Sequence, residues 1–252
     1  MRVLVTFALE NEFAPWRKMA GFERVTASDS RRRYKARIGS AEVEVVVTGI
    51  GRFAAQRAME DAFDKTPDFC IASGLAGALK ANYLLGEVLA ARWVTDIKSG
   101  RSFPGDSELL ELAAESGAKL VERFLVTEHV IAAAAEKREL ASSGDAVEME
   151  GAHILAVATQ KRVRALAIRS VSDAADQDLP LEFDETFDDE GQVRISNIFR
   201  QVVAKPGRVG GLIRLAADSA RAANSLANFL HAFVQALPAR FRGVAKADAI
   251  AL

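Results

Sequence analysis

Short runs of apolar and β-branched residues recur along the chain, separated by stretches whose apolar residues repeat at helical spacing. Such runs are typical of strands, and such stretches are typical of helices. The expected strands are Val3–Phe7, Tyr34–Arg37, Val43–Thr48, Phe69–Ala72, Glu87–Ile97, Phe124–Thr127 and Val163–Val171. The expected helices are Phe53–Phe63, Ser107–Ser116, Ala132–Leu140, Ala152–Gln160 and Arg208–Leu237. This alternation predicts an α/β fold with a largely parallel sheet and helices on both faces.

One segment predicts an exception to the parallel arrangement. Gly39 and Ser40 lie between two expected strands and have the composition of a hairpin turn, so we expect a mixed sheet. The chain of 252 residues fits one domain, which we place at residues 1–238, followed by a C-terminal tail at 239–252. The acidic stretch Asp176–Gln192 has few apolar residues and predicts a long loop.

Charge and cysteine content narrow the classes of partner. Lys and Arg total 33 against 34 Asp and Glu, which gives no electrostatic reason to expect nucleic acid or an anionic membrane. The single cysteine, Cys70, lies in an apolar run and has no partner for an internal disulfide. No apolar stretch reaches the roughly 18 residues of a membrane span. We therefore expect a cytoplasmic protein whose partner is a small molecule.

Glycines and acidic residues follow directly after several expected strands. Glu10 and Glu12 follow the first strand, and Thr48–Gly51 and Ala72–Gly77 follow two others. In open α/β sheets, ligands bind at the carboxyl ends of strands, although helix dipoles and tight turns would also explain these residues. Neither glycine segment has the spacing of a dinucleotide-binding motif or a phosphate-binding P-loop.

Two further segments bring carboxylates together. An expected strand carries Glu148 and Glu150 around Met149, and a later strand ends in Ser172 and Asp173. Carboxylates whose environments push their pKa values apart can act as general acid and general base. The alternative from spacing alone is a structural ion pair with Arg169.

Taken together, these motifs resemble the 5′-methylthioadenosine/S-adenosylhomocysteine nucleosidases and the related purine nucleoside phosphorylases. The resemblance spans most of the chain. The matching segments, in the family's order, are Ala8–Glu12, Thr48–Gly51, Gly74–Ala78, Val147–Glu150 and Arg169–Asp176. The resemblance implies a single-domain nucleoside phosphorylase/nucleosidase fold with a mixed central β-sheet flanked by helices on both faces. It also implies hydrolysis of the N-glycosidic bond of an adenosine derivative with a modified 5′ position, releasing adenine without a cofactor or a metal.

The same resemblance implies roles for individual residues. Asp173 would donate a proton to the purine N7, and Glu12 would act as the base that holds the attacking water. Glu150 would bind the ribose hydroxyls, with Met149 packed against the sugar. The resemblance places the rest of the substrate pocket at Leu9, Ile50, Leu75, Ala76, Gly77, Ile131, Ser172 and Phe183.

The chain also departs from its relatives. Ala72 and Leu75 stand where hexameric phosphorylases carry an arginine and a phosphate-binding serine, which favours water over phosphate as the nucleophile. Arg52 is the remaining candidate for binding an anion. Leu75 also replaces a serine of the nucleosidases, and Ile131 lies near their stacking phenylalanine, so base recognition is expected to differ.

Two other functions stay open at this point. One is a phosphate-dependent purine nucleoside phosphorylase, including the hopanoid-associated type, and the other is a non-catalytic nucleoside-binding member of the fold. The resemblance further implies a homo-oligomer, expected to be a dimer.

Overall fold

The computed structural model describes residues 1–25, 32–63, 66–180 and 209–241. Its strands are β1 Arg2–Phe7, β2 Glu23–Arg24, β3 Arg32–Ile38, β4 Ala41–Val47, β5 Phe69–Ala78, β6 Val88–Asp96, β7 Ser102–Pro104, β8 Lys119–Val126, β9 Ala146–Glu148 and β10 Arg164–Asp173. Its helices are α1 Glu10–Ala20, α2 Arg52–Ala62, α3 Ser107–Glu115, α4 Ala134–Leu140, α5 Gly151–Gln160 and α7 Val209–Arg240. The α/β alternation predicted from the sequence is confirmed.

The strands form one mixed sheet in the order β10-β6-β8-β9-β5-β1-β4-β3-β2, with β7 paired to β6. Strand β10 also pairs with β5, so the first five strands of this path close into a ring. β1 is parallel to both β4 and β5, whereas β3 and β4 form the expected antiparallel hairpin. Its turn contains Gly39 at a φ of 58°, in the left-handed region that favours glycine.

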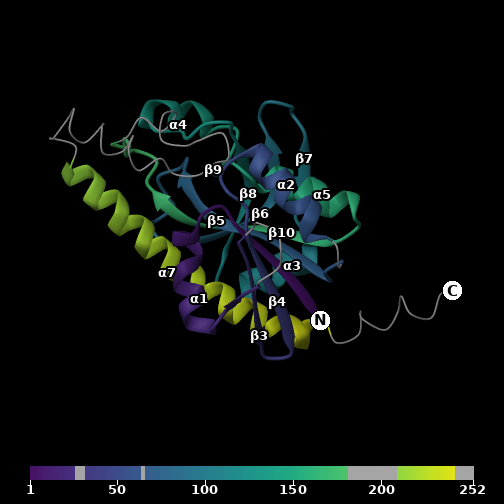
Figure 1. Cartoon of the computed structure of the whole chain (residues 1–252). Coiled ribbons are helices and arrows are strands. Elements are labelled where there is room, and N and C mark those ends of the chain that lie inside the picture. The colour runs from purple at the N-terminus through teal and green to yellow at the C-terminus, as the bar shows by residue number, and fades with distance from the viewer. Residues whose placement is uncertain (26–31, 64–65, 181–208, 242–252) are drawn as a thin grey trace.

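Helices cover both faces of the sheet. Helix α7 runs along one side with α1 beside it, and α2 and α5 lie on the opposite side (Figure 1). Each face has its own apolar core, and alternate residues of a strand enter alternate cores: Val3 and Val5 pack on the α7 side and Leu4 on the α2 side. This period of two is what a strand buried on both faces requires.

Two predicted boundaries next to the candidate site were wrong. Strand β5 does not end at Ala72 but continues to Ala78, because Gly74 to Gly77 pair along β10 as a regular strand. Strand β9 is shorter than expected and ends at Glu148, so Met149 and Glu150 lie in the connection to α5.

Some expectations fall outside what the structure describes. Most of the predicted loop Asp176–Gln192 and of the tail at 239–252 lies there, so the domain boundary stays a prediction. Cys70 is a free, buried thiol as expected, and burial raises its pKa to about 12. In the described residues, no helix is long and apolar enough to cross a membrane.

Candidate active site

A cavity of about 150 Å³ lies where β1, β5, β9 and β10 bring together segments that the sequence analysis predicted for the site. It is lined by Ala8, Leu9, Glu12, Ile50, Leu75, Ala76, Gly77, Thr127, Val130, Ile131, Val147, Glu148, Met149, Glu150, Ser172, Asp173 and Leu179. Four of these are carboxylates, and no Lys or Arg is among the described lining residues. The cavity therefore combines apolar walls with a concentration of acidic groups.

Eleven of the thirteen residues predicted for the site lie around this cavity. They come from separate stretches of the chain, which the sheet brings together. Phe183 lies outside the described residues. Arg52, the candidate anion ligand, is an exposed residue at the start of α2, stacked over the Phe53 ring at 5.8 Å, and it does not line the cavity.

Glu148 is held in place by an ion pair and by hydrogen bonds from the backbone. It forms a buried ion pair with Arg169, whose side chain is 1% exposed. The Glu148 carboxylate also accepts hydrogen bonds from the backbone N–H groups of Glu150, at 3.1 Å, and of Gly151. It thus caps the start of α5 and fixes the connection that carries Met149 and Glu150. The structural ion pair considered from spacing alone is present for Glu148 and not for Glu150.

Glu150 and Glu12 make no ion pair with any described residue, although both are buried. Glu150 accepts a hydrogen bond of 2.6 Å from the Gly51 N–H, and Glu12 accepts bonds of 3.1 Å from the Ala8 and Leu9 N–H groups. Desolvation by burial, reinforced by the neighbouring Glu148 charge, raises the pKa of Glu150 to about 8. Burial also raises the pKa of Glu12, against the lowering effect of its backbone hydrogen bonds and of Arg169.

Asp173 ends β10 and has a different environment. Its Oδ1 accepts a 2.7 Å hydrogen bond from the Ser172 hydroxyl, and its Oδ2 accepts one of 2.5 Å from the Lys137 ammonium. The register between β10 and β5 shifts at Ser172, and this bulge sets Asp173 opposite Gly77. A Cβ at Gly77 would lie 2.8 Å from Asp173 Oδ2, so only glycine leaves room for the carboxyl group.

The sequence analysis did not identify Lys137, and it gave the structural role of Glu148 only as an alternative. Lys137 stands in the charged stretch Glu136–Glu139, which is typical of a solvated helix face, and no motif marks it. For Glu148 the signal was present, because its ion pair with Arg169 was one of the alternatives. The described residues include no group of three or more His, Cys, Asp and Glu side chains placed to hold a metal.

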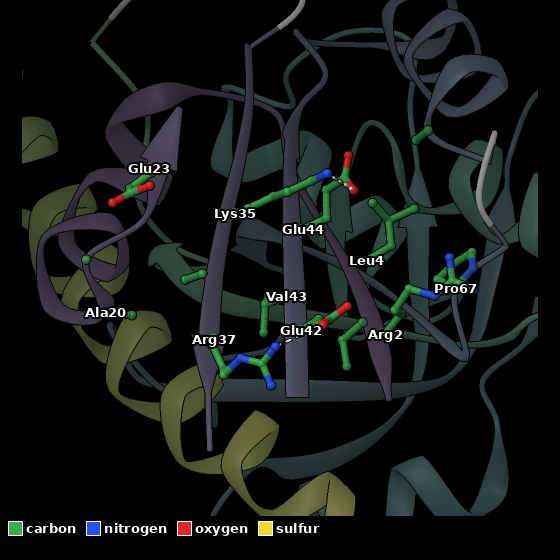
Figure 2. Close-up of a pocket in the computed structure, with 14 residues that line it drawn as sticks. Arg2, Leu4, Ala20, Glu23, Lys35, Arg37, Glu42, Val43, Glu44 and Pro67 are labelled. Atoms are coloured by element: carbon green, nitrogen blue, oxygen red, sulfur yellow. Dashed lines mark hydrogen bonds and ion pairs between the residues drawn. The ribbon is translucent and has the colours of Figure 1, made fainter. Parts of the chain in front are cut away.

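A larger cavity of about 700 Å³ lies at the opposite end of the parallel strands, around the start of β1 and β4 (Figure 2). Four of its charged side chains pair with one another: Arg37 with Glu42 at 3.0 Å, and Lys35 with Glu44 at 3.6 Å. Ligands of α/β sheets bind at the carboxyl ends of the strands, which is where the smaller, acidic cavity lies. We therefore take the smaller cavity as the candidate active site.

Known proteins share both the sequence pattern and the fold. A family model described as the phosphorylase superfamily matches residues 2–204. A curated 5′-methylthioadenosine/S-adenosylhomocysteine nucleosidase from Shewanella loihica is 29% identical over 168 residues, covering 56% of this chain and 73% of the relative.

Solved structures agree over nearly the whole length. The futalosine hydrolase of Helicobacter pylori superposes with a TM-score of 0.71 at 20% identity, covering 93% of this chain and 97% of that one. The 5′-methylthioadenosine/S-adenosylhomocysteine nucleosidase of S. pneumoniae, with a transition-state inhibitor, also gives 0.71, at 21% identity, covering 94% and 100%. These likenesses confirm the expected fold.

Proposed function

Because the chain belongs to the phosphorylase superfamily, we propose that it is a purine nucleosidase, which hydrolyses the N-glycosidic bond of a nucleoside. The observation that carries the choice of water over phosphate is the charge of the cavity. Four carboxylates line it, and no described Lys or Arg does. Phosphate is an anion and needs cationic or N–H donors, so a described lining with four acidic side chains and no Lys or Arg disfavours it.

Glu12 and Glu150, the two lining carboxyl groups without an ion pair to a described residue, are suited to act on the ribose and on the attacking water. As the glycosidic bond lengthens, the ribose acquires the positive charge of an oxocarbenium ion, which a nearby carboxylate stabilises. Glu150 would accept the ribose hydroxyls, and Glu12 would accept a proton from the attacking water. Both side chains are less than a tenth exposed, so in their ionised forms their charge acts in a medium of low dielectric constant.

Asp173 is suited to act on the purine, which is the leaving group. A purine leaves readily once N7 carries a proton, and a carboxyl group at a strand end beside apolar walls can supply it. Leu75, Ile131 and Leu179 provide such walls around Asp173 in the same cavity.

We further propose a 5′-modified adenosine as the substrate class, on the strength of the curated nucleosidase relative. Futalosine-type substrates are the second candidate, because futalosine hydrolases are among the structural neighbours. Both classes join a purine base to a ribose with a modified 5′ position, so a direct comparison of substrates decides between them.

Base release measured by chromatography tests the proposal. Methylthioadenosine, S-adenosylhomocysteine, adenosine, inosine and futalosine would each be incubated with the enzyme, with and without phosphate. We expect release in phosphate-free buffer, at a rate that added phosphate does not raise. Strict dependence on phosphate would instead establish a phosphorylase.

A further inference from the structure

A lysine side chain lies buried directly behind the proposed acid. Lys137 is 0% exposed, and its Nζ donates to Asp173 Oδ2 at 2.5 Å, to the Ala174 carbonyl at 2.9 Å and to the Gln177 carbonyl at 3.1 Å. An ammonium group has three N–H donors, and these three acceptors occupy all of them. The geometry is that of a fully bonded ammonium whose only anionic partner among them is Asp173.

The position of this lysine in the fold is unusual. Lys137 is the only buried residue of α4, a helix of 7 residues. A helix that packs on a protein ordinarily buries apolar side chains, and burying a charge costs several kcal/mol unless a partner compensates. An apolar residue would anchor α4 at lower cost, so packing alone does not explain a lysine here.

Two further hydrogen bonds tie α4 to the segment after Asp173. The Ala134 N–H donates to Asp178 Oδ1 at 2.8 Å, and the Leu179 N–H donates to the Ala132 carbonyl at 2.8 Å. The start of α4 is therefore fixed relative to the chain that follows Asp173. The ammonium is held in place by the fold rather than by Asp173 alone.

We propose that Lys137 is a positioning residue for Asp173, which fixes the direction of the carboxyl group and neutralises the carboxylate that forms during the reaction. This inference rests on the proposed nucleosidase function. In the step concerned, the O–H bond of Asp173 breaks and an N7–H bond forms, while the electrons of the glycosidic bond pass to the purine. Asp173 is left as a buried carboxylate, 2.5 Å from the Lys137 ammonium.

The benefit is specific to the transition state. In the form that donates the proton, the carboxyl group carries no charge to pair with Lys137, whereas the carboxylate that forms gains a full ion pair in a buried site. Lys137 should therefore contribute to kcat much more than to KM. The Ser172 hydroxyl, which bonds the other carboxyl oxygen, completes the orientation of Asp173.

A double-mutant cycle tests this role. Lys137→Met removes the ammonium and keeps a side chain of similar length. We expect it to lower kcat for base release by about 10- to 1000-fold, with KM changed less than about fivefold. In an Asp173→Asn background, the same substitution should lower single-turnover release by less than about threefold, because Lys137 acts through Asp173. Lys137→Arg, which keeps a cation, should recover part of the lost kcat.

Lys80 provides a matched control. Its Nζ donates to Asp145 Oδ1 at 2.6 Å, and Asp145 is also buried, but neither residue lines the cavity. Lys80→Met should leave kcat within about threefold of wild type. Circular dichroism and a thermal shift with nucleoside would show that each variant is folded and binds.

The outcomes separate this inference from the proposed function. If wild-type enzyme releases no base from any nucleoside, the proposed function fails. If wild-type enzyme is active and Lys137→Met keeps its kcat within about threefold, or loses equally in both backgrounds, Lys137 is no positioning residue for Asp173.

Discussion

Of the four carboxylates that line the cavity, two have a buried cation beside them and two do not. Asp173 pairs with Lys137 and Glu148 with Arg169, while Glu12 and Glu150 make no ion pair with a described residue. A buried carboxylate without a cation holds its proton more tightly, which is why burial raises the pKa of both Glu12 and Glu150. The arrangement thus places two ion-paired and two unpaired carboxyl groups within one cavity.

Glu150→Gln should stabilise the protein, increasingly so as the pH rises. The folded-state pKa of Glu150 is raised from 4.5 to about 8, so between these values the folded protein retains a proton that the unfolded chain has lost. The free energy of unfolding therefore falls as the pH rises through this window, and glutamine, which does not titrate, removes that loss. We expect little difference near pH 4.5 and a gain on the order of 4 kcal/mol at about pH 8.

Thermal unfolding at a series of pH values checks this prediction. Glu42→Gln is the control, because Glu42 is exposed and pairs with Arg37 at the surface. A gain for Glu150→Gln that does not depend on pH would show that burial does not hold the proton. Activity should be lost in the same variant, since the amide, unlike the ionised form of Glu150, cannot supply a carboxylate charge.

Asp173→Asn should abolish most turnover without unfolding the protein. Asparagine has nearly the same volume as aspartate and retains an oxygen that can accept from Lys137, but it cannot donate an acidic proton. We expect kcat to fall by about 100- to 10,000-fold, measured as base release, with an unchanged circular dichroism spectrum. Turnover close to that of wild type would remove Asp173 from the mechanism.

At the scale of elements, β5 and β10 set the position of the acid. Their parallel pairing runs from Phe69 to Gly77 on β5, with a register shift at Ser172 that aligns Asp173 with Gly77. The sequence indicated a turn at Gly74–Gly77, because glycines after an apolar run are typical of turns. Pairing with β10 keeps this segment extended, and such a tertiary contact leaves no local signature in the sequence.

Gly77→Ala should impair catalysis through this element contact. The added Cβ would lie 2.8 Å from Asp173 Oδ2, and the hydrogen bond from Lys137 leaves that oxygen little freedom to move. Because a misplacement of about 1 Å can cost about 100-fold in rate, we expect kcat to fall by roughly 10- to 100-fold. Steady-state kinetics of base release would measure this fall in kcat.

Gly210→Ala is the control for that substitution. Gly210 lies exposed in α7, and nothing stands within 4 Å of the position that an added Cβ would take. Alanine favours a helix over glycine by roughly 0.5–1 kcal/mol, so this variant should be slightly more stable and fully active. Equal kinetics for the two variants would contradict the proposed contact at Gly77.

At the scale of the whole molecule, the α/β fold could be predicted, but the closure of five of its strands into a ring could not. Apolar runs at strand and helix spacing indicated the α/β class, and the order of motifs indicated the site at the carboxyl ends of the strands. The ring made by the second pairing of β10 rests on long-range contacts, as does the burial of Lys137, and neither has a periodic pattern. The homo-oligomer and the domain boundary at 238 remain predictions.

Binding and turnover should separate in the Asp173→Asn variant, which tests whether this molecule is an enzyme or only a nucleoside-binding member of the fold. A ligand that binds only the folded state at about 100 times its Kd stabilises that state by about 2.7 kcal/mol. For a chain of 252 residues this raises Tm by about 5–10 °C. We expect methylthioadenosine to give such a shift in the variant, and wild-type enzyme to release adenine from the same nucleoside. A shift in both proteins with no base released by wild type would identify a binding protein, because the cavity would then hold the nucleoside without cleaving it.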